Sequence, residues 1–314
     1  MNLSFLRRWL RFSKRFYSST TSASKLVSLT NRSVFEVTGK DSAKLLQGLI
    51  TNDIGLLSET NRVIHTYLLN VQGRIINDVL IYSNSSEENN FLVECDLSQC
   101  DPLSQHLKKY KLRSKVKFAN RNDLKVFSLF GNNIENHSTE IPNFLCDPRM
   151  KSMGYRLVSE NNIDAIADVL ECPIQISTED SYLSHRYSLG ISEGITEVEN
   201  GIPLEHNGAF LDSINFNKGC YVGQELVARA NFTGVIRKRV MPVVLEKALD
   251  LKSLSDTTVY NQKGKRAGKI LGVKGVSGIG LLRLNEALNK QHLVLRTDKG
   301  DVTLTTDKPD WWPE

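Results

Sequence analysis

Hydrophobic and polar positions alternate along the chain from about residue 33, and the period of the alternation changes from segment to segment. A period of two predicts the strand Ser33–Val37. A helical period follows, with Asp41 or Ser42 able to cap the N-terminus. The runs Val63–Val71 and Arg74–Tyr82 are rich in apolar and β-branched residues and are separated by two residues. This spacing predicts a β-hairpin.

The same alternation of strands and helices continues to about residue 190. Strands are predicted at Phe91–Glu94, Val116–Phe118, Leu124–Phe130 and Tyr155–Val158. Helices are predicted to start at Pro102, where proline suits the first turn, over residues 163–170, and at Tyr182–Leu189. From residue 239 onward the pattern changes to short strands separated by Gly, Lys and Asp turns, which predicts a small barrel or sandwich. These strands are Arg239–Leu245, Thr257–Asn261, Gly268–Val273, Gly278–Leu284 and Leu293–Arg296.

The charge of the chain is concentrated at its N-terminus. The 314 residues carry a net charge of +5, but the first carboxylate is Glu36 and the first 17 residues hold five basic side chains. The other 35 basic residues equal the 35 acidic ones in number. A protein that coats nucleic acid spreads positive charge over its fold, so this class is excluded. The Arg-rich, Ser-rich, acid-free start predicts a mitochondrial transit peptide over residues 1–17, cleaved between about residues 17 and 25. The alternative is a basic amphipathic helix retained at a membrane surface.

Two further properties narrow the class of protein. No apolar run approaches the roughly 18 residues of a membrane span. The five cysteines are irregularly spaced and odd in number, so a disulfide framework is not indicated and a reducing compartment is favoured. Four of them are predicted to be ordinary packing residues, namely Cys95, Cys100, Cys146 and Cys172.

The fifth cysteine lies in the most unusual segment, Asn215–Glu225. Gly219 and Gly223 permit close approach of a ligand. Lys218 precedes Cys220 by two positions, and an ammonium close to the sulfur would lower the thiol pKa. From the residues alone, a reactive thiol on a tight loop and a buried cysteine in an ordinary turn are equally good interpretations.

The segment Lys218-Gly219-Cys220-Tyr221-Val222-Gly223-Gln224-Glu225, followed by Arg229, resembles the signature of the YgfZ-type proteins. These belong to the superfamily of the glycine-cleavage T-protein, a folate-dependent aminomethyltransferase. Other segments are similar to motifs of the same superfamily. They are Thr38–Asp41, Gln47–Asp53, Gln72–Arg74 with Asp78, Asp147–Arg149 with Gly154 and Arg156, and Gly194 with Pro203–Glu205.

The resemblance implies an α+β fold of the aminomethyltransferase type, with two interlocked α+β subdomains and a small C-terminal β-barrel. The folate-binding domain is expected over residues 30–235 and the barrel over residues 236–314. Together with the transit peptide, the resemblance indicates the mitochondrial branch that assists iron–sulfur cluster assembly.

The resemblance also assigns candidate site residues. Asp78 matches an aspartate at the one-carbon chemistry; the alternatives are a solvent-facing residue on a strand and a structural acceptor for Arg74. Asn52 and Asp53 would line the pocket, or cap the preceding helix. Arginines could bind the carboxylates of a folate tail, or form a solvated charged face. The expected folate-binding set is Asn52, Asp53, Arg74, Glu205, Gly219, Tyr221, Gly223, Gln224, Glu225 and Arg229, with Arg237 and Arg239 as further tail contacts.

The catalytic candidates are the thiol of Cys220, with Lys218 and Asp78. Aminomethyltransferases lack the Lys-Gly-Cys-Tyr motif, so transfer chemistry is not what this motif implies. Thiolates suit iron–sulfur chemistry, but one cysteine cannot hold a cluster alone. We therefore expect no stable metal and only a transient contact between Cys220 and a cluster shared with a partner.

The resulting hypothesis is a factor of the mitochondrial matrix that works with A-type iron–sulfur scaffold proteins. Its clients would be [4Fe–4S] enzymes such as aconitase and lipoate synthase, with tetrahydrofolate as a candidate cofactor. One alternative is an enzyme, a tetrahydrofolate-dependent one-carbon transferase. The other is a tRNA-modification factor, a role that the near-neutral body of the chain argues against for direct RNA binding.

Overall fold

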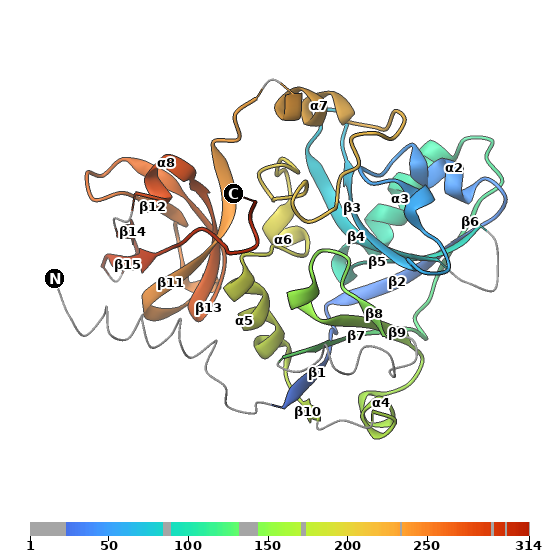
Figure 1. Cartoon of the computed structure of the whole chain (residues 1–314), viewed down its shortest axis with the longest axis horizontal. Coiled ribbons are helices and arrows are strands. Elements are labelled where there is room, and N and C mark those ends of the chain that lie inside the picture. The colour runs from blue at the N-terminus through green and yellow to red at the C-terminus, as the bar shows by residue number, and fades with distance from the viewer. Residues whose placement is uncertain are drawn as a thin grey trace.

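The computed structural model describes residues 23–83, 89–131, 144–170, 174–232, 234–289, 292–298 and 300–313. The expected transit peptide at residues 1–17 lies outside these ranges. Two five-stranded sheets and a closed five-stranded barrel make up the described part of the molecule. The barrel lies at one end of the molecule and the two sheets at the other (Figure 1). Among the described residues, no helix is both long and apolar enough to cross a membrane.

The first sheet carries the motifs that point to function. Its strand order is β3-β4-β5-β2-β6, and every neighbouring pair is antiparallel. The strands are β2 (Arg32–Thr38), β3 (Val63–Leu69), β4 (Ile75–Ser83), β5 (Asn90–Asp96) and β6 (Lys117–Asn120). The hairpin expected from the sequence is the β3–β4 pair.

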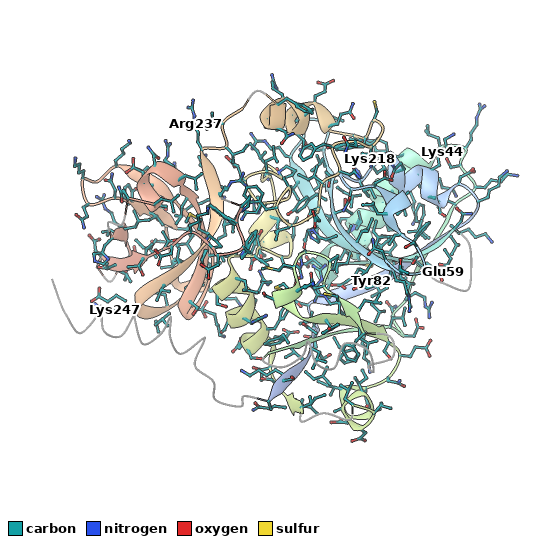
Figure 2. The ribbon with its side chains drawn as sticks, viewed as in Figure 1. Lys44, Glu59, Tyr82, Lys218, Arg237 and Lys247 are labelled. Atoms are coloured by element: carbon teal, nitrogen blue, oxygen red, sulfur yellow. The ribbon has the colours of Figure 1, made fainter. Side chains whose placement is uncertain are left out.

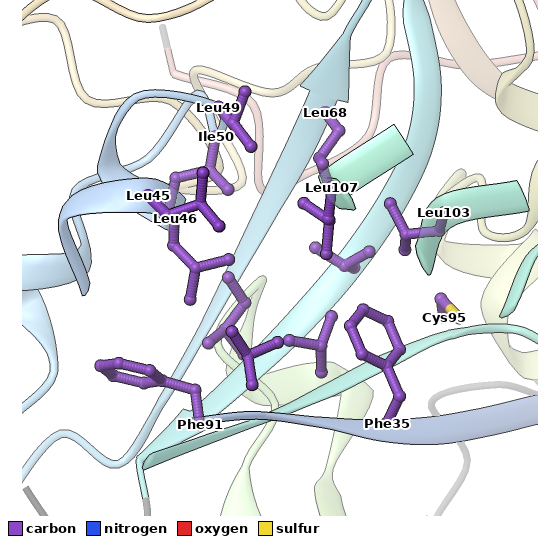
Figure 3. Close-up of a cluster of buried hydrophobic side chains, with 14 of the residues drawn as sticks. Phe35, Leu45, Leu46, Leu49, Ile50, Leu68, Phe91, Cys95, Leu103 and Leu107 are labelled. Carbon is purple, nitrogen blue, oxygen red and sulfur yellow. The ribbon is translucent and has the colours of Figure 1, made fainter. Parts of the chain in front are cut away.

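Two helices cover one face of this sheet and bury the core beneath them. They are α2 (Ser42–Gln47) and α3 (Cys100–Lys111). Leu45 and Leu46 of α2 and Leu103 and Leu107 of α3 point at strand residues such as Phe35 (Figure 3). Because burying a leucine side chain contributes about 1.5–3 kcal/mol, this cluster fixes the position of α2 on the sheet.

The second sheet has the order β10-β1-β7-β9-β8, and only the β1–β10 pair is parallel. Its strands are β1 (Ser24–Ser28), β7 (Lys125–Phe130), β8 (Leu145–Cys146), β9 (Tyr155–Ser159) and β10 (Ile174–Ile176). The chain leaves this sheet after β1 and returns to it at β7, so the two sheets are interlocked. β1 lies ahead of the domain start expected at residue 30.

Four further helices follow β9 in the described part of the chain and precede the barrel. They are α4 (Ile163–Asp168), α5 (Glu179–Leu189), α6 (Ile195–Val198) and α7 (Gln224–Phe232). The described residues also form four 3-10 turns, η1 (Ile54–Leu56), η2 (Leu97–Gln99), η4 (Lys151–Met153) and η5 (Leu251–Ser253). α5 lies between the barrel and the second sheet (Figure 1).

The barrel closes in the order β11-β13-β12-β14-β15. Its elements are β11 (Lys238–Asp250), β12 (Thr258–Tyr260), β13 (Arg266–Arg283), β14 (Leu293–Leu295), β15 (Val302–Thr305) and the short helix α8 (Leu284–Ala287). The sequence predicted two strands where the structure has the single strand β13, so that prediction is wrong. Glycines within β13 were interpreted as a turn, but they let one strand bend round the barrel. The α+β fold with a C-terminal barrel is confirmed.

Candidate functional site

Three motif segments that are far apart in sequence meet at one edge of the first sheet. They are residues 47–53 after helix α2, the β3–β4 turn at residues 70–74, and the thiol segment at residues 215–225. The Asn215 amide donates to the Thr51 carbonyl at 3.0 Å, and the Val222 amide donates to the Gly48 carbonyl at 3.0 Å. The thiol segment is therefore attached to residues at and just after the end of α2 on both sides of Cys220.

Lys218 supplies a third attachment between these points. Its Nζ donates to the carbonyls of Gln47, Ile50 and Asn52 at 2.8, 2.7 and 2.6 Å. An ammonium group has three donors, and all three are used here. Lys218 therefore has no N–H left to donate to the sulfur of Cys220.

The environment of Lys218 is half-buried. Burial lowers the pKa of the Lys218 ammonium to about 8, opposed only by the negative charge of Asp53. The Tyr221 ring lies 5.0 Å from Nζ and adds a cation–π contact. At pH 7 the group is therefore mainly an ammonium, the form that can serve three carbonyls.

Two glycines let the thiol segment pack on the β3–β4 turn. Gly223 has φ +81°, and a Cβ there would lie 2.5 Å from the Asn70 carbonyl oxygen. Gly73 has φ +77°, and a Cβ there would lie 2.8 Å from the Gly223 carbonyl oxygen. Both positions need glycine, because a side chain would be strained at this φ and would meet backbone. The β3–β4 turn and the thiol segment are therefore in direct backbone contact.

Cys220 lies at the exposed part of this attached segment. Its thiol is free and its side chain is exposed, so a buried cysteine in an ordinary turn is ruled out. A Cβ at the neighbouring Gly219 would have no heavy atom within 4 Å, so space is open beside the thiol. The Tyr221 amide donates to Gln224 Oε1 at 3.1 Å, which fixes the chain just after the cysteine.

The other cysteines divide into two kinds. Cys95 and Cys100 are buried in the core of the first sheet, as expected for packing residues. Cys146 is exposed, so the packing prediction is wrong for this residue. Cys172 lies outside the described residues. Within the ranges that the structure describes, no group of three or more His, Cys, Asp or Glu side chains is placed to hold a metal ion.

A cavity of about 560 Å³ lies beside the thiol segment. Asn215, Phe216 and Asn217 of that segment line it, and Asn52 lines it from the 47–53 segment. The remaining lining residues are Leu56, Asn61, Val63, Ile64, His65, Pro148, Ala209, Asp212 and Ile214. Its volume lies within the roughly 300–1,000 Å³ of small-molecule sites. The same short segment therefore lines a cavity and presents a thiol.

His65 brings an unpaired acceptor to the cavity lining. Its Nδ1 lies 2.6 Å from Ser213 Oγ, whose hydroxyl donates to the Leu211 carbonyl. Because a serine has one donor, Nδ1 must carry the imidazole proton. Burial and the positive charge of Arg149 hold the pKa of His65 well below its usual value, so the ring is neutral. Nε2 is then an acceptor, and it has no hydrogen-bond partner among the described residues.

Asp78 does not line this cavity. It is 1% exposed, accepts from the Gly194 amide at 3.1 Å and lies 3.7 Å from Arg32 Nη1. Its pKa is raised, mainly because burial disfavours the charged carboxylate. Arg74 is exposed and donates to the Asn200 carbonyl at 3.5 Å. Neither the pocket role nor the role as acceptor for Arg74 holds, and Asp78 is part of a buried ionic network.

That network links the two sheets. Arg32 on β2 donates to Glu94 on β5 at 2.8 Å. Arg156 on β9 of the second sheet lies 3.8 Å from the same Glu94 carboxylate and donates to Glu193 at 2.6 Å. Arg149 also donates to Glu193, at 2.8 Å. The Asp-Pro-Arg and Gly-x-Arg motifs therefore supply side chains that hold the subdomains together.

The remaining predicted site residues are scattered. Asn52 is buried and lines the cavity, while its side-chain amide donates to the carbonyls of His65 and Asp212. Asp53 caps η1, the turn after it, instead of the preceding helix. Arg239 is buried against the Phe210 ring and donates to the Leu204 carbonyl, so it cannot serve as a folate-tail contact. Glu205 is half-buried, and Glu225, Arg229 and Arg237 are exposed.

Sequence reasoning missed the residues that give the cavity its polar character, chiefly Asn61, His65 and Asp212. His65 lies within an apolar strand run, where a histidine gives no signal of its own. Asn215 and Asn217 flank the recognised motif and could have been found as neighbours of its polar stretch. Lys218 and Arg237 both lie in the upper half of the molecule in the view of Figure 2.

Comparisons with known proteins agree with this geometry. Residues 3–166 match the GCVT N-terminal domain, and residues 237–314 match the CAF17 C-terminal beta-barrel domain. The glycine cleavage system aminomethyltransferase T from Bartonella henselae has a similar structure, with a TM-score of 0.72 over 93% of this chain and 87% of that chain. At 12% sequence identity, this likeness shows the fold alone.

Closer relatives carry one name. The iron–sulfur cluster assembly factor IBA57, mitochondrial, of Homo sapiens is 33% identical over 306 residues, which cover 91% of this chain and 84% of that protein. The Mus musculus protein of the same name is 33% identical, with 91% and 84% covered. The IBA57 homolog of Mycosarcoma maydis is 31% identical, with 94% and 86% covered. With about a third of its residues identical over most of their length, this chain belongs to the family of the mitochondrial iron–sulfur cluster assembly factors named IBA57.

Proposed function

We propose that this chain is a mitochondrial iron–sulfur cluster assembly factor and that the Cys220 thiol ligates a cluster that it shares with a partner protein. The observation that carries the proposal is the exposed, free thiol of Cys220 in a segment attached on both sides. The names of the relatives supply the iron–sulfur role and the mitochondrial location.

The chemistry follows from what one thiol can do. The thiol loses its proton to solvent, and the thiolate sulfur donates an electron pair to an iron ion in place of another ligand, with no change of oxidation state. Clusters are held by about four such ligands, so the others must come from elsewhere. No group of metal-ligating side chains surrounds Cys220 in the described part of the chain. The remaining ligands therefore belong to the partner.

The partner that fits this requirement is an A-type scaffold protein, which carries a cluster on its own thiolates and can release it to a [4Fe–4S] client. Aconitase and lipoate synthase in the matrix are the clients we propose. The exposed position of Cys220 allows a partner cluster to approach, because space beside Gly219 is open.

A variant in cells tests this proposal. Cys220→Ser keeps the size and exposure of the side chain but removes the sulfur ligand. We expect aconitase activity and protein lipoylation to fall while the variant protein accumulates normally. Cys146→Ser is the matched control, because Cys146 is the other exposed thiol among the described residues, and it should leave both readouts unchanged. Normal aconitase activity and lipoylation in Cys220→Ser would refute the role of this thiol.

The cavity supports a second candidate function, binding of a folate-type heterocycle. Its volume suits such a ring, and His65 in its lining carries a buried acceptor, Nε2, that has no partner among the described residues. The two asparagines of the thiol segment, Asn215 and Asn217, would bind ring heteroatoms. Calorimetry with tetrahydrofolate tests this, and His65→Phe should weaken binding. Absence of binding heat at millimolar tetrahydrofolate would exclude the cofactor.

Transfer of a one-carbon unit is not supported by the same cavity. The acid expected at that chemistry is Asp78, which is absent from the cavity lining and is paired with Arg32 and the Gly194 amide. We therefore derive no transfer step. A direct role on tRNA also lacks support, because the chain beyond residue 17 carries 35 charges of each sign.

A further inference from the structure

We propose that Lys218 is the positioning residue of the thiol segment, which it holds to the end of helix α2 so that Cys220 is presented at a fixed place. The inference rests on the proposed role of Cys220 as a cluster ligand and assigns a distinct task to the lysine of the signature. Lys218 donates hydrogen bonds to backbone carbonyls and takes no part in the chemistry of the Cys220 sulfur.

The contacts of Nζ carry this inference. Gln47 is the last residue of α2, and Ile50 and Asn52 lie in the chain just after it. The three carbonyl oxygens converge on Nζ within 2.6–2.8 Å. In the described ranges, no carboxylate lies within ion-pair distance of Nζ, so these carbonyls are its main partners. Lysine near a helix C-terminus commonly bonds carbonyls left without intrahelical donors.

The shape of the group explains why lysine is needed. An ammonium is compact and directs three donors tetrahedrally from one atom, whereas the donors of an arginine guanidinium lie in one plane. Three oxygens converging on a single atom match the first geometry. Arginine therefore keeps the charge at residue 218 without keeping the contacts.

The location of the attachment explains its effect on the thiol. Cys220 lies two residues after Lys218, and Tyr221 and Val222 are held by Gln224 Oε1 and by the Gly48 carbonyl. Without the Lys218 contacts, the nearest attachment before the thiol is the Asn215 amide. The stretch around Cys220 that has no attachment then becomes longer. Binding a partner cluster must then also order this stretch, and the loss of chain entropy weakens the binding.

The test compares Lys218→Met and Lys218→Arg with the wild type and with Lys44→Met. Lys44 is exposed on α2, so its replacement removes a nearby charge without removing an attachment. The rate at which a disulfide reagent modifies Cys220 is measured across pH in a Cys146→Ser, Cys172→Ser background, where the other described thiols, Cys95 and Cys100, are buried. Amide hydrogen exchange reports the order of residues 215–223.

We expect both Lys218 variants to exchange amide hydrogens faster over residues 215–223, with the pH profile of thiol modification unchanged. Formation of a shared cluster with an A-type scaffold protein should fall about 10- to 100-fold in both, the usual effect of losing a residue that orients a metal ligand. Lys44→Met should behave as the wild type. A thiol-modification profile that moves to higher pH in Lys218→Met and is restored in Lys218→Arg would overturn the inference and make Lys218 a thiol activator.

The exchange and thiol measurements need no partner protein, so they test Lys218 independently. If amide hydrogen exchange over residues 215–223 is unchanged in Lys218→Met, the positioning role is refuted even if Cys220 ligates a cluster. Cluster sharing by a Cys220→Ser variant refutes the proposed function instead, whatever the exchange data give.

Discussion

Glu193 is the residue on which the buried ionic network depends most. Its Oε2 accepts from Arg149 at 2.8 Å, from Arg156 at 2.6 Å and from the Tyr182 hydroxyl at 2.9 Å. The two arginines hold the pKa of Glu193 well below its usual value, against the effect of burial. Removing this one charge would leave the buried Arg156 with no carboxylate of the described residues closer than 3.8 Å, the distance to those of Glu94 and Asp147.

Glu193→Gln is therefore expected to lower the free energy of unfolding by about 3–5 kcal/mol, the usual loss when one partner of a buried ion pair is removed. Urea unfolding at pH 7 measures it. Glu160→Gln is the matched control, because Glu160 is largely exposed and its contact with Arg121 is long, at 3.5 Å. This variant should lose less than about 1 kcal/mol of unfolding free energy. Equal losses in the two variants would contradict the account of the network.

Residue roles were the least predictable part of the site. The spacing of Lys218 and Cys220 in sequence suggested that the ammonium lies at the sulfur, but a long side chain can reach carbonyls of a distant segment. Asp78 was assigned to a pocket by resemblance, and the fold pairs it with Arg32. The exposure of Cys220 could not be predicted from its neighbours, since glycine-rich segments occur both in buried turns and in open loops.

At the scale of elements, the site depends on the close packing of the thiol segment on the β3–β4 turn. Strands and helices of the first sheet were predictable because their periods are clear, and the β3–β4 hairpin has a two-residue separation in the sequence. The contact between that hairpin and residues 215–225 was not predictable, since neither segment has a sequence feature that indicates the other as its packing partner. The contact requires glycine at Gly73 and Gly223, and this requirement can be seen only in the folded structure.

Gly223→Ala tests this packing. A Cβ would lie 2.5 Å from the Asn70 carbonyl oxygen and would strain a residue at φ +81°, so we expect a loss of about 1–3 kcal/mol in unfolding free energy. Gly219→Ala, in the same segment, has open space and should change stability by less than about 1 kcal/mol. Thermal or urea unfolding compares the two. A harmless Gly223→Ala would show that the two turns are not in close contact.

At the scale of the whole molecule, interlocked sheets and a barrel meet around a buried core. The chain crosses from the second sheet to the first after β1 and returns at β7, an exchange that local periodicity cannot reveal. The overall α+β class with a barrel was predictable through the resemblance of its motifs. His206 lies buried near the barrel, where its Nδ1 is 2.9 Å from Ser192 Oγ.

Acid should destabilise the molecule partly through His206. Burial, with a contribution from Lys269, lowers the pKa of His206 to about 4. Between pH 6.5 and pH 4 the unfolded chain binds a proton there that the folded chain does not, so stability falls as the pH falls. The contribution is about 1.4 kcal/mol per pH unit. Urea unfolding of the wild type and of His206→Asn at several pH values measures it, and identical pH slopes would contradict the assignment.

The central claim is that Cys220 ligates a cluster shared between this chain and an A-type scaffold protein. The most direct measurement mixes the purified chain, under anaerobic conditions, with a scaffold protein that carries a [2Fe–2S] cluster, and follows the complex by size-exclusion chromatography with absorbance and iron analysis. The account predicts a coloured, iron-containing complex with the wild type and with Cys146→Ser, and none with Cys220→Ser. An equally coloured complex with Cys220→Ser would contradict it.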